Sequence, residues 1–155
     1  MPESRRAAQS ETTLLYLVKR VELAVRSRLD EVLRPGGLTT LQYTALTVLQ
    51  RHPASLTSAQ LARNSFVTAQ TMADMVSALL DRGLIDRNRD PADRRRLVLT
   101  LTPEGEALLS RFRGPVEELE ARMLSDLTAK QAAELRTSLL SCRAALERPV
   151  GGTLE

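Results

Sequence analysis

The sequence predicts a mainly α-helical protein with one small β-hairpin, and three observations lead to this fold class. Apolar residues recur at three- and four-residue steps along several segments, which is typical of amphipathic helices. One stretch changes to a two-residue period on either side of an Arg-rich turn, which is typical of a hairpin. Capping boxes of the form Thr-x-x-Gln stand where three of the helical segments begin: Thr39 with Gln42, Thr57 with Gln60, and Thr128 with Gln131.

The first predicted helix covers residues 12–33 and carries its apolar side chains on one stripe. It ends at the Arg-Pro-Gly-Gly sequence of residues 34–37, because proline cannot continue a helix and glycine allows the chain to reverse. Two shorter helices follow, at about 39–51 and 58–63. Their side chains expected to face the core are Leu41, Ala45, Leu46, Leu49, Leu61 and Ala62.

A longer helix is predicted from the cap at Thr68 to about Arg82, and Gly83 ends it. Residues 84–89 and 97–101 then form the two strands of the hairpin, and the polar turn at 90–95 joins them. The core side chains expected from these elements are Met72, Met75, Val76, Leu79 and Leu80 from the helix and Leu97, Leu99 and Leu101 from the second strand.

Two long helices complete the prediction. The first begins at Thr102-Pro103 and runs to about residue 124, and Gly114-Pro115 predicts a kink or a break inside it. The last covers 129–147 and carries Cys142 on its apolar stripe, where we expect a buried structural thiol rather than a redox sensor.

Composition excludes several classes of protein. The 155 residues suit one domain, and 43% hydrophobic with 26% charged residues is typical of a globular chain. A single cysteine and a single histidine argue against a disulfide framework and against a His/Cys metal site, so no cofactor or metal is expected. No apolar run is long enough for a membrane span, and the first residues contain no apolar signal core. We therefore expect a cytoplasmic protein.

Arginine is concentrated in one place, with five arginines between residues 87 and 96. An Arg-rich loop can be a solvated turn or an electrostatic contact with nucleic acid, and its context decides between them. Here it is the tip of a hairpin that directly follows a helix-turn-helix, and this order of elements predicts a winged helix-turn-helix. In that arrangement the second helix of the turn enters the DNA major groove and the hairpin reaches the backbone or the minor groove.

Several stretches resemble the DNA-binding core of the MarR family (multiple-antibiotic-resistance repressor type). They are LTSAQLA at 56–62 with VTAQTM at 67–72, LLDRGLIDR at 79–87, and DPADRR at 90–95 followed by LTLTPEG at 99–105. The resemblance extends over residues 1–155 as a single MarR-like domain. It implies a homodimeric repressor on a pseudo-palindromic operator, with dimerisation helices at 10–36 and 103–148 and the winged helix at 37–102. It also implies release by a small aromatic or anionic ligand.

The predicted contacts with double-stranded DNA lie on the helix at 68–82 and on the wing. Gln70 can bridge adenine and Thr71 can contact thymine, whereas Ser65 and Thr68 stand where a helix N-terminus binds phosphate. The resemblance makes Arg95 the minor-groove arginine and Asp93 the carboxylate that holds it. We expect Arg94 and Arg96 to contact the backbone. Relatives often carry an arginine at one of three positions that are occupied here by Ala69, Asp74 and Ala78.

This departure keeps an alternative open, in which the winged helix is a protein–protein interaction module without specific DNA readout. Three amphipathic helices outside the winged helix favour a homodimer over an intramolecular three-helix bundle, because a small winged helix cannot cover their apolar surface. The sequence contains no Gly-rich phosphate loop, no nucleophile–base pair and no metal set, so we do not expect an enzyme.

Overall fold

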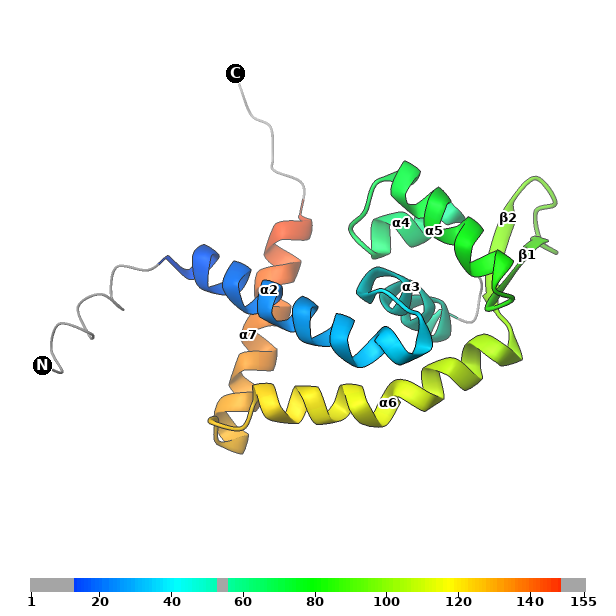
Figure 1. Ribbon diagram of the computed structural model, residues 1–155. Coiled ribbons are helices and arrows are strands. Elements are labelled where there is room, and N and C mark those ends of the chain that lie inside the picture. Colours follow the sequence, from blue (N-terminus) through cyan, green and yellow to red (C-terminus); the bar gives the residue numbers. More distant parts are fainter. Residues whose placement is uncertain (1–12, 53–55, 149–155) are drawn as a thin grey trace, which may run out of the picture. The chain divides into compact units, whose positions relative to one another are not determined.

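The computed structural model describes residues 13–52 and 56–148 (Figure 1). Within these residues it contains six α-helices and one antiparallel hairpin, so the predicted fold class is confirmed. By contacts the chain divides into two compact units, Met1–Val116 and Glu117–Glu155. The elements, in order, are α2 (Leu14–Leu33), the short 3₁₀ helix η1 (Arg34–Gly36), α3 (Thr40–Arg51), α4 (Ser58–Asn64), α5 (Ala69–Asp81), β1 (Ile85–Arg89), β2 (Leu97–Leu101), α6 (Pro103–Met123) and α7 (Ala129–Glu147).

Threonine side chains begin the helices as the sequence predicts. The three predicted capping boxes are all formed, at the start of α3, α4 and α7. Thr68 caps α5 by accepting the N–H of Thr71, and Thr102 caps α6 by accepting the N–H of Gly105 at 3.1 Å. Each cap satisfies a backbone donor that the first helical turn cannot pair internally.

One hydrophobic core holds the first unit together. Its fully buried side chains come from the end of α2 and from α3, α4, α5 and both strands, and Leu109 and Phe112 of α6 join them. The predicted core residues of α4 and α5 are buried or half-buried, whereas Leu41 is 36% exposed. Leu41 lies in the first turn of α3 beside a surface cavity, which leaves its side chain partly in solvent.

The ends of α2 and α5 are tied together by Arg82. Its guanidinium donates to the carbonyl oxygens of Gly36 at 2.8 Å and Gly37 at 2.9 Å. Gly37 and Gly83 both have positive φ, at 64° and 67°, so the chain reverses at the two predicted stops in the conformation that glycine favours. The orientation of α5 is thereby fixed at its C-terminal end.

The hairpin pairs Ile85 with Leu101 at its base and Arg89 with Leu97 near its tip. The outer edge of β2 also pairs with Leu56, through a hydrogen bond of 2.8 Å from the Leu99 N–H. Leu99 is buried as predicted, but Leu97 is 47% exposed because it lies near the tip. Val98, which stands between these two leucines, is buried as well, so the simple two-residue alternation is wrong for this strand.

Of the kink or break predicted at Gly114-Pro115, the break does not occur, because α6 continues through both residues to Met123. A proline removes one backbone hydrogen bond, and a helix of 21 residues retains enough others to continue.

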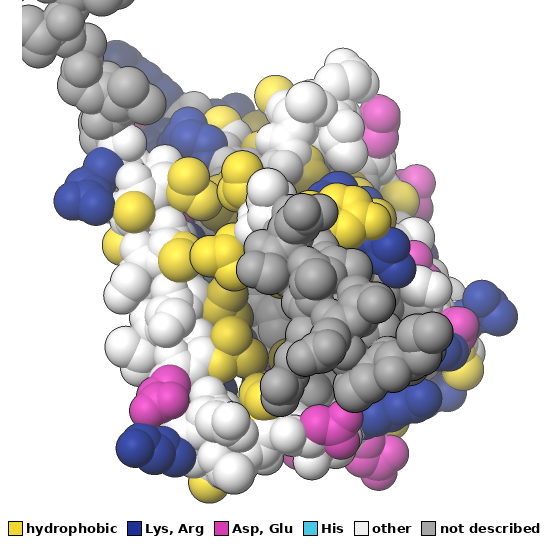
Figure 2. Space-filling model, turned by 90° about the vertical axis from the view of Figure 1, so that its left-hand side faces the viewer, with side chains coloured by type: hydrophobic (Ala, Val, Ile, Leu, Met, Phe, Trp, Pro, Cys, Tyr) yellow, Lys and Arg dark blue, Asp and Glu magenta, His cyan; other side chains and the backbone are white. Residues whose placement is uncertain are grey.

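Much apolar surface of the described residues stays uncovered, and Figure 2 shows part of it as yellow side chains. Only Leu33 is buried on α2, and no residue is buried on α7. Cys142 is exposed, so the expectation of a buried thiol is wrong for the single chain. The large exposed apolar side chains of the two helices are Leu14, Leu15, Tyr16, Leu17, Val18, Val21 and Leu23 on α2 and Leu135, Leu139, Leu140 and Leu146 on α7.

Candidate nucleic-acid interface

The exposed face of α5 carries the polar residues that the sequence singles out. Gln70, Thr71, Asp74 and Ser77 are exposed, whereas Ala78 is half-buried. The Gln70 amide donates to Asp74 Oδ1 at 3.2 Å, which orients both side chains along the outside of the helix. This pairing also reduces the freedom of the one acidic group on the face.

Thr68 and Thr71 form a second polar pair at the start of the same helix. The Thr68 hydroxyl accepts the Thr71 N–H at 3.1 Å and donates to the Thr71 hydroxyl at 3.0 Å. Both residues remain exposed. The helix N-terminus therefore presents two hydroxyl oxygens in a fixed arrangement.

Ser65, predicted to bind a phosphate, is the C-cap residue of α4. Its hydroxyl is buried and has no hydrogen-bond partner among the described residues. Its N–H donates to the Leu61 and Ala62 carbonyls at the end of α4. The next residue, Phe66, has φ 56° and a ring that is 78% exposed.

The wing tip, residues 90–96, is closed by short backbone contacts. The Asp90 N–H donates to the Arg96 carbonyl and the Arg96 N–H to the Asp93 carbonyl, both at 2.9 Å. Asp90 Oδ1 accepts the Ala92 N–H at 2.9 Å, which is an Asx turn. The tip is thus a defined turn that positions its arginines.

The two arginines at the centre of the tip are free to bind a ligand. Arg94 and Arg95 are exposed, and within the described part of the chain their guanidinium groups have no hydrogen-bond or ion-pair partner. Asp93 holds Arg95 through the main chain, since its Oδ1 accepts the Arg95 N–H at 3.0 Å. Arg89 supports the same segment by donating to the Arg94 carbonyl at 2.8 Å.

Arg96 differs from its neighbours, because its side chain is engaged within the protein. It donates to Gln60 Oε1 of α4 at 3.1 Å and lies 3.5 Å from Asp90 Oδ2. The sequence gives no signal for this contact, since the two partners are distant along the chain.

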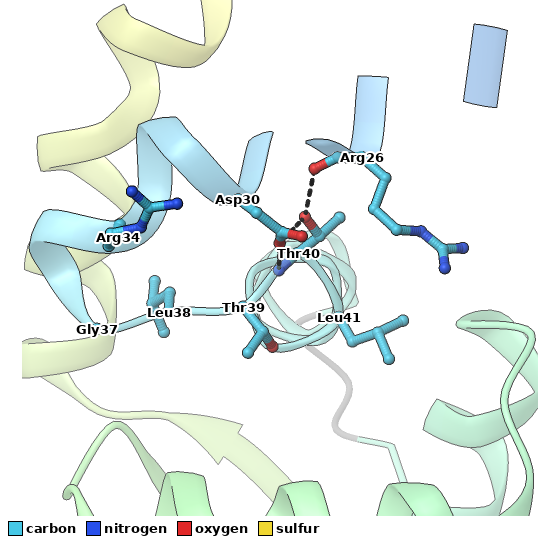
Figure 3. Close-up of a pocket in the computed structure, with 8 residues that line it drawn as sticks. All are labelled: Arg26, Asp30, Arg34, Gly37, Leu38, Thr39, Thr40 and Leu41. Carbon is cyan, nitrogen blue, oxygen red and sulfur yellow. Dashed lines mark hydrogen bonds between the residues drawn. The ribbon is translucent and has the colours of Figure 1, made fainter. Parts of the chain in front are cut away.

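A cavity of about 400 Å³ lies between α2 and the start of α3. Figure 3 shows Arg26 and Arg34 on opposite sides of a contact between Asp30 and Thr40. Asp30 Oδ1 accepts the Thr40 hydroxyl at 2.6 Å and the Thr40 N–H at 3.0 Å. These two bonds, helped by the nearby Arg26 and Arg34 guanidinium groups, hold the pKa of Asp30 below its ordinary value of 3.8.

A helix-turn-helix followed by a two-stranded wing defines a winged-helix protein. A sequence model of the MarR family matches residues 36–96. The HTH-type transcriptional repressor Rv2887 of Mycobacterium tuberculosis is 36% identical over 129 residues, which are 83% of this chain and 92% of that protein.

Two solved structures have the same fold. The repressor CouR of Rhodococcus jostii bound to a 23-mer DNA duplex has a TM-score of 0.71 at 31% identity, covering 88% of this chain and 93% of CouR. Wild-type MarR of Escherichia coli in its apo form has a TM-score of 0.73 at 26% identity, covering 84% and 97%.

The chain belongs to the MarR family, as its motifs imply. Members of this family are DNA-binding transcription regulators and not enzymes. In the segments 13–52 and 56–148, no helix has the length and apolar character that a membrane span requires. Over the same described residues, no three His, Cys, Asp or Glu side chains form a group that could hold a metal ion.

The Asp30–Thr40 contact predicts a pH-dependent contribution to stability. A carboxylate whose pKa is lowered on folding stabilises the protein above its ordinary pKa, and this contribution is lost as the pH falls through the folded-state pKa. Thr40→Val should therefore lower the free energy of unfolding most near neutral pH. The difference from wild type should shrink as the pH falls below 3.8, the ordinary pKa of Asp30.

Urea unfolding at a series of pH values and one protein concentration measures this difference. Thr44→Val is the matched control, because the Thr44 hydroxyl donates at 2.8 Å to the Thr40 carbonyl, which does not titrate. An equal pH dependence in the two variants would contradict a role for the Asp30 charge.

Proposed function

We propose that the protein is a homodimeric transcriptional repressor that binds a pseudo-palindromic operator in the cytoplasm, with one winged helix on each half-site. The observation that carries this proposal is the wing tip, where Arg94 and Arg95 are exposed and lack partners within the described residues. Arginines held on a defined turn suit the phosphates and the narrow minor groove of A/T-rich DNA. The relative from M. tuberculosis is named a transcriptional repressor, and CouR is named a repressor in complex with DNA.

In this proposal α5 lies in the major groove and supplies modest base readout. Gln70 and Thr71 face adenine and thymine edges, and the hydroxyl of Thr68 binds a phosphate beside the helix N-terminus. Asp74 is paired with Gln70 and cannot replace an arginine as a base contact. Much of the affinity therefore comes from the wing, through Arg95 in the minor groove and Arg94 on the backbone.

Dimerisation would cover the apolar surface that the chain leaves exposed. The helices at 10–36 and 103–148 would pair with the same helices of a second chain, and the winged helix at 37–102 would remain free to bind DNA. The support is the exposure of apolar side chains on α2 and α7, including Leu15 at 81% and Leu146 at 83%. A patch of this kind is typical of an interface rather than of a solvent-facing helix.

The cavity between α2 and α3 is the proposed site for a small anionic effector. Arg34 lines it, and among the described residues its side chain makes no hydrogen bond or ion pair, so it can bind a carboxylate. Asp30 stays ionised because its pKa is lowered, but the two hydrogen bonds from Thr40 offset part of its negative charge and so weaken its repulsion of such a ligand. An aromatic acid suits a cavity that also contains Leu38 and Leu41.

The winged helix could instead serve as a protein–protein interaction module, a function that the absence of recognition-helix arginines at 69, 74 and 78 favours. The two functions differ in their response to salt. Binding to duplex DNA releases counterions and weakens steeply as salt rises, whereas a protein interface lacks this dependence.

Arg95→Ala should weaken binding to duplex DNA from upstream of the coding region (the upstream duplex) by about 1–3 kcal/mol, because it removes one specific contact. Fluorescence anisotropy measures the affinity, and size-exclusion chromatography checks the dimer. Arg113→Ala is the control, since Arg113 is also exposed but lies on α6 away from the wing tip. Wild-type affinity in a dimeric Arg95→Ala protein would rule out the proposed wing contact.

Val18→Asp should separate the dimer into monomers, because a buried unpaired carboxylate in an apolar interface is strongly unfavourable. Light scattering after size exclusion gives the mass. Ser27→Asp places the same charge on the opposite face of α2, nine residues or about two and a half turns from Val18, and should leave the mass unchanged. If both variants had the mass of the wild type, the proposed interface on α2 would be wrong.

Salicylate serves as the probe for the effector site, and calorimetric titration measures its binding. Arg34→Ala should weaken salicylate binding about tenfold by removing a charge-assisted hydrogen bond. Arg28→Ala is the control, because Arg28 pairs with Glu31 at 3.0 Å and does not line the cavity. Equal affinity in the two variants would exclude Arg34 from the site.

A further inference from the structure

Arg96 reaches from the wing to the helix-turn-helix, and this contact has no counterpart at Arg94 or Arg95. Its Nη2 donates to Gln60 Oε1 at 3.1 Å, across a separation of 36 residues. Its Nη1 lies 3.5 Å from Asp90 Oδ2 at the other side of the tip. One guanidinium therefore joins α4 to both ends of the wing turn.

The acceptor on α4 is itself held in place. Gln60 Oε1 also accepts the Thr57 N–H at 2.9 Å and lies 3.2 Å from the Thr57 hydroxyl. In return, the Gln60 N–H donates to that hydroxyl at 3.2 Å. The capping box that begins α4 thus fixes the oxygen that Arg96 binds.

The main chain of Arg96 transmits this constraint to the tip. Its carbonyl accepts the Asp90 N–H and its N–H donates to the Asp93 carbonyl, so its backbone closes the turn that carries Arg94 and Arg95. A side chain fixed on α4 consequently limits how far the whole tip can swing relative to the helices.

We propose that Arg96 is a positioning residue for DNA binding and not a DNA contact. It holds the wing tip at a fixed place relative to α4, so that the free arginines and the exposed face of α5 reach the same duplex together. This inference rests on the proposed DNA-binding function. It replaces the expectation that Arg96 contacts the backbone, because its guanidinium is already engaged by Gln60 and Asp90.

The test is the affinity for the upstream duplex of Arg96→Met, Gln60→Met and the double variant, measured by anisotropy between about 50 and 200 mM salt. Each single variant should bind about tenfold more weakly, the scale of one lost hydrogen bond to a charged group. The double variant should be no weaker than either single variant, because both remove the same contact. The slope of log affinity against log salt should stay at its wild-type value.

Two further variants separate positioning from a loss of helix stability. Gln42→Met removes the corresponding glutamine from the capping box of α3, where no wing arginine is bound, and should keep wild-type affinity. Gln60→Glu retains the acceptor oxygen and should rescue the binding that Gln60→Met loses. Thermal unfolding of each variant confirms that it is folded, and Arg96→Met leaves every capping box intact.

Two results would overturn the inference while leaving DNA binding in place. The first is a slope reduced by about 0.9 in Arg96→Met with wild-type affinity in Gln60→Met, which would show a direct phosphate contact. The second is wild-type affinity in Arg96→Met. If the folded wild-type protein itself bound no duplex, the proposed function would fail and the inference with it.

Discussion

The buried core of the first unit is the constraint on which the rest of the structure depends. The end of α2, the three helices α3 to α5, the hairpin and the first half of α6 all contribute side chains to it. Because interiors pack at nearly crystalline density, the elements around this core cannot shift independently. The exposed face of α5 and the base of the wing therefore have a fixed relation. Arg82 at the end of α5 and Arg96 at the end of the wing turn add polar links at the two edges of this arrangement.

The proposed homodimer rests on the apolar surface that the single chain leaves exposed. Leu33 is the only buried residue of α2, although the helix carries leucines and valines along its whole length. No residue of α7 is buried, and a cavity lined by Leu135 and Leu139 lies between it and the end of α6. Surface of this kind is stabilised when a second apolar surface covers it. A symmetric partner offers the same helices in return, which is the basis of the proposed homodimer.

Local signals in the sequence predicted most of the fold, because caps, stops and periodicity depend on neighbouring residues. The three Thr-x-x-Gln boxes, the glycine stop at Gly83 and the hairpin are all where the pattern predicts them. The features that were missed depend on contacts between distant residues. Arg96 and Gln60 meet only in the folded chain, and the positive φ of Phe66, which accompanies the buried hydroxyl of Ser65, is set by a turn between two packed helices. Cys142 was also predicted wrongly, because an apolar stripe shows which face of α7 is hydrophobic but not whether another part of the same chain covers that face.

The proposed repressor binds double-stranded DNA through this winged helix, and the sharpest experiment compares how the wild-type protein binds two duplexes. Fluorescence anisotropy would compare the upstream duplex with a scrambled duplex of the same composition, with salt raised from about 50 to 200 mM. We expect tighter binding to the upstream duplex and an affinity that falls linearly on logarithmic axes as salt increases. A folded dimer that bound neither duplex would contradict this proposal and would favour the protein-interaction module.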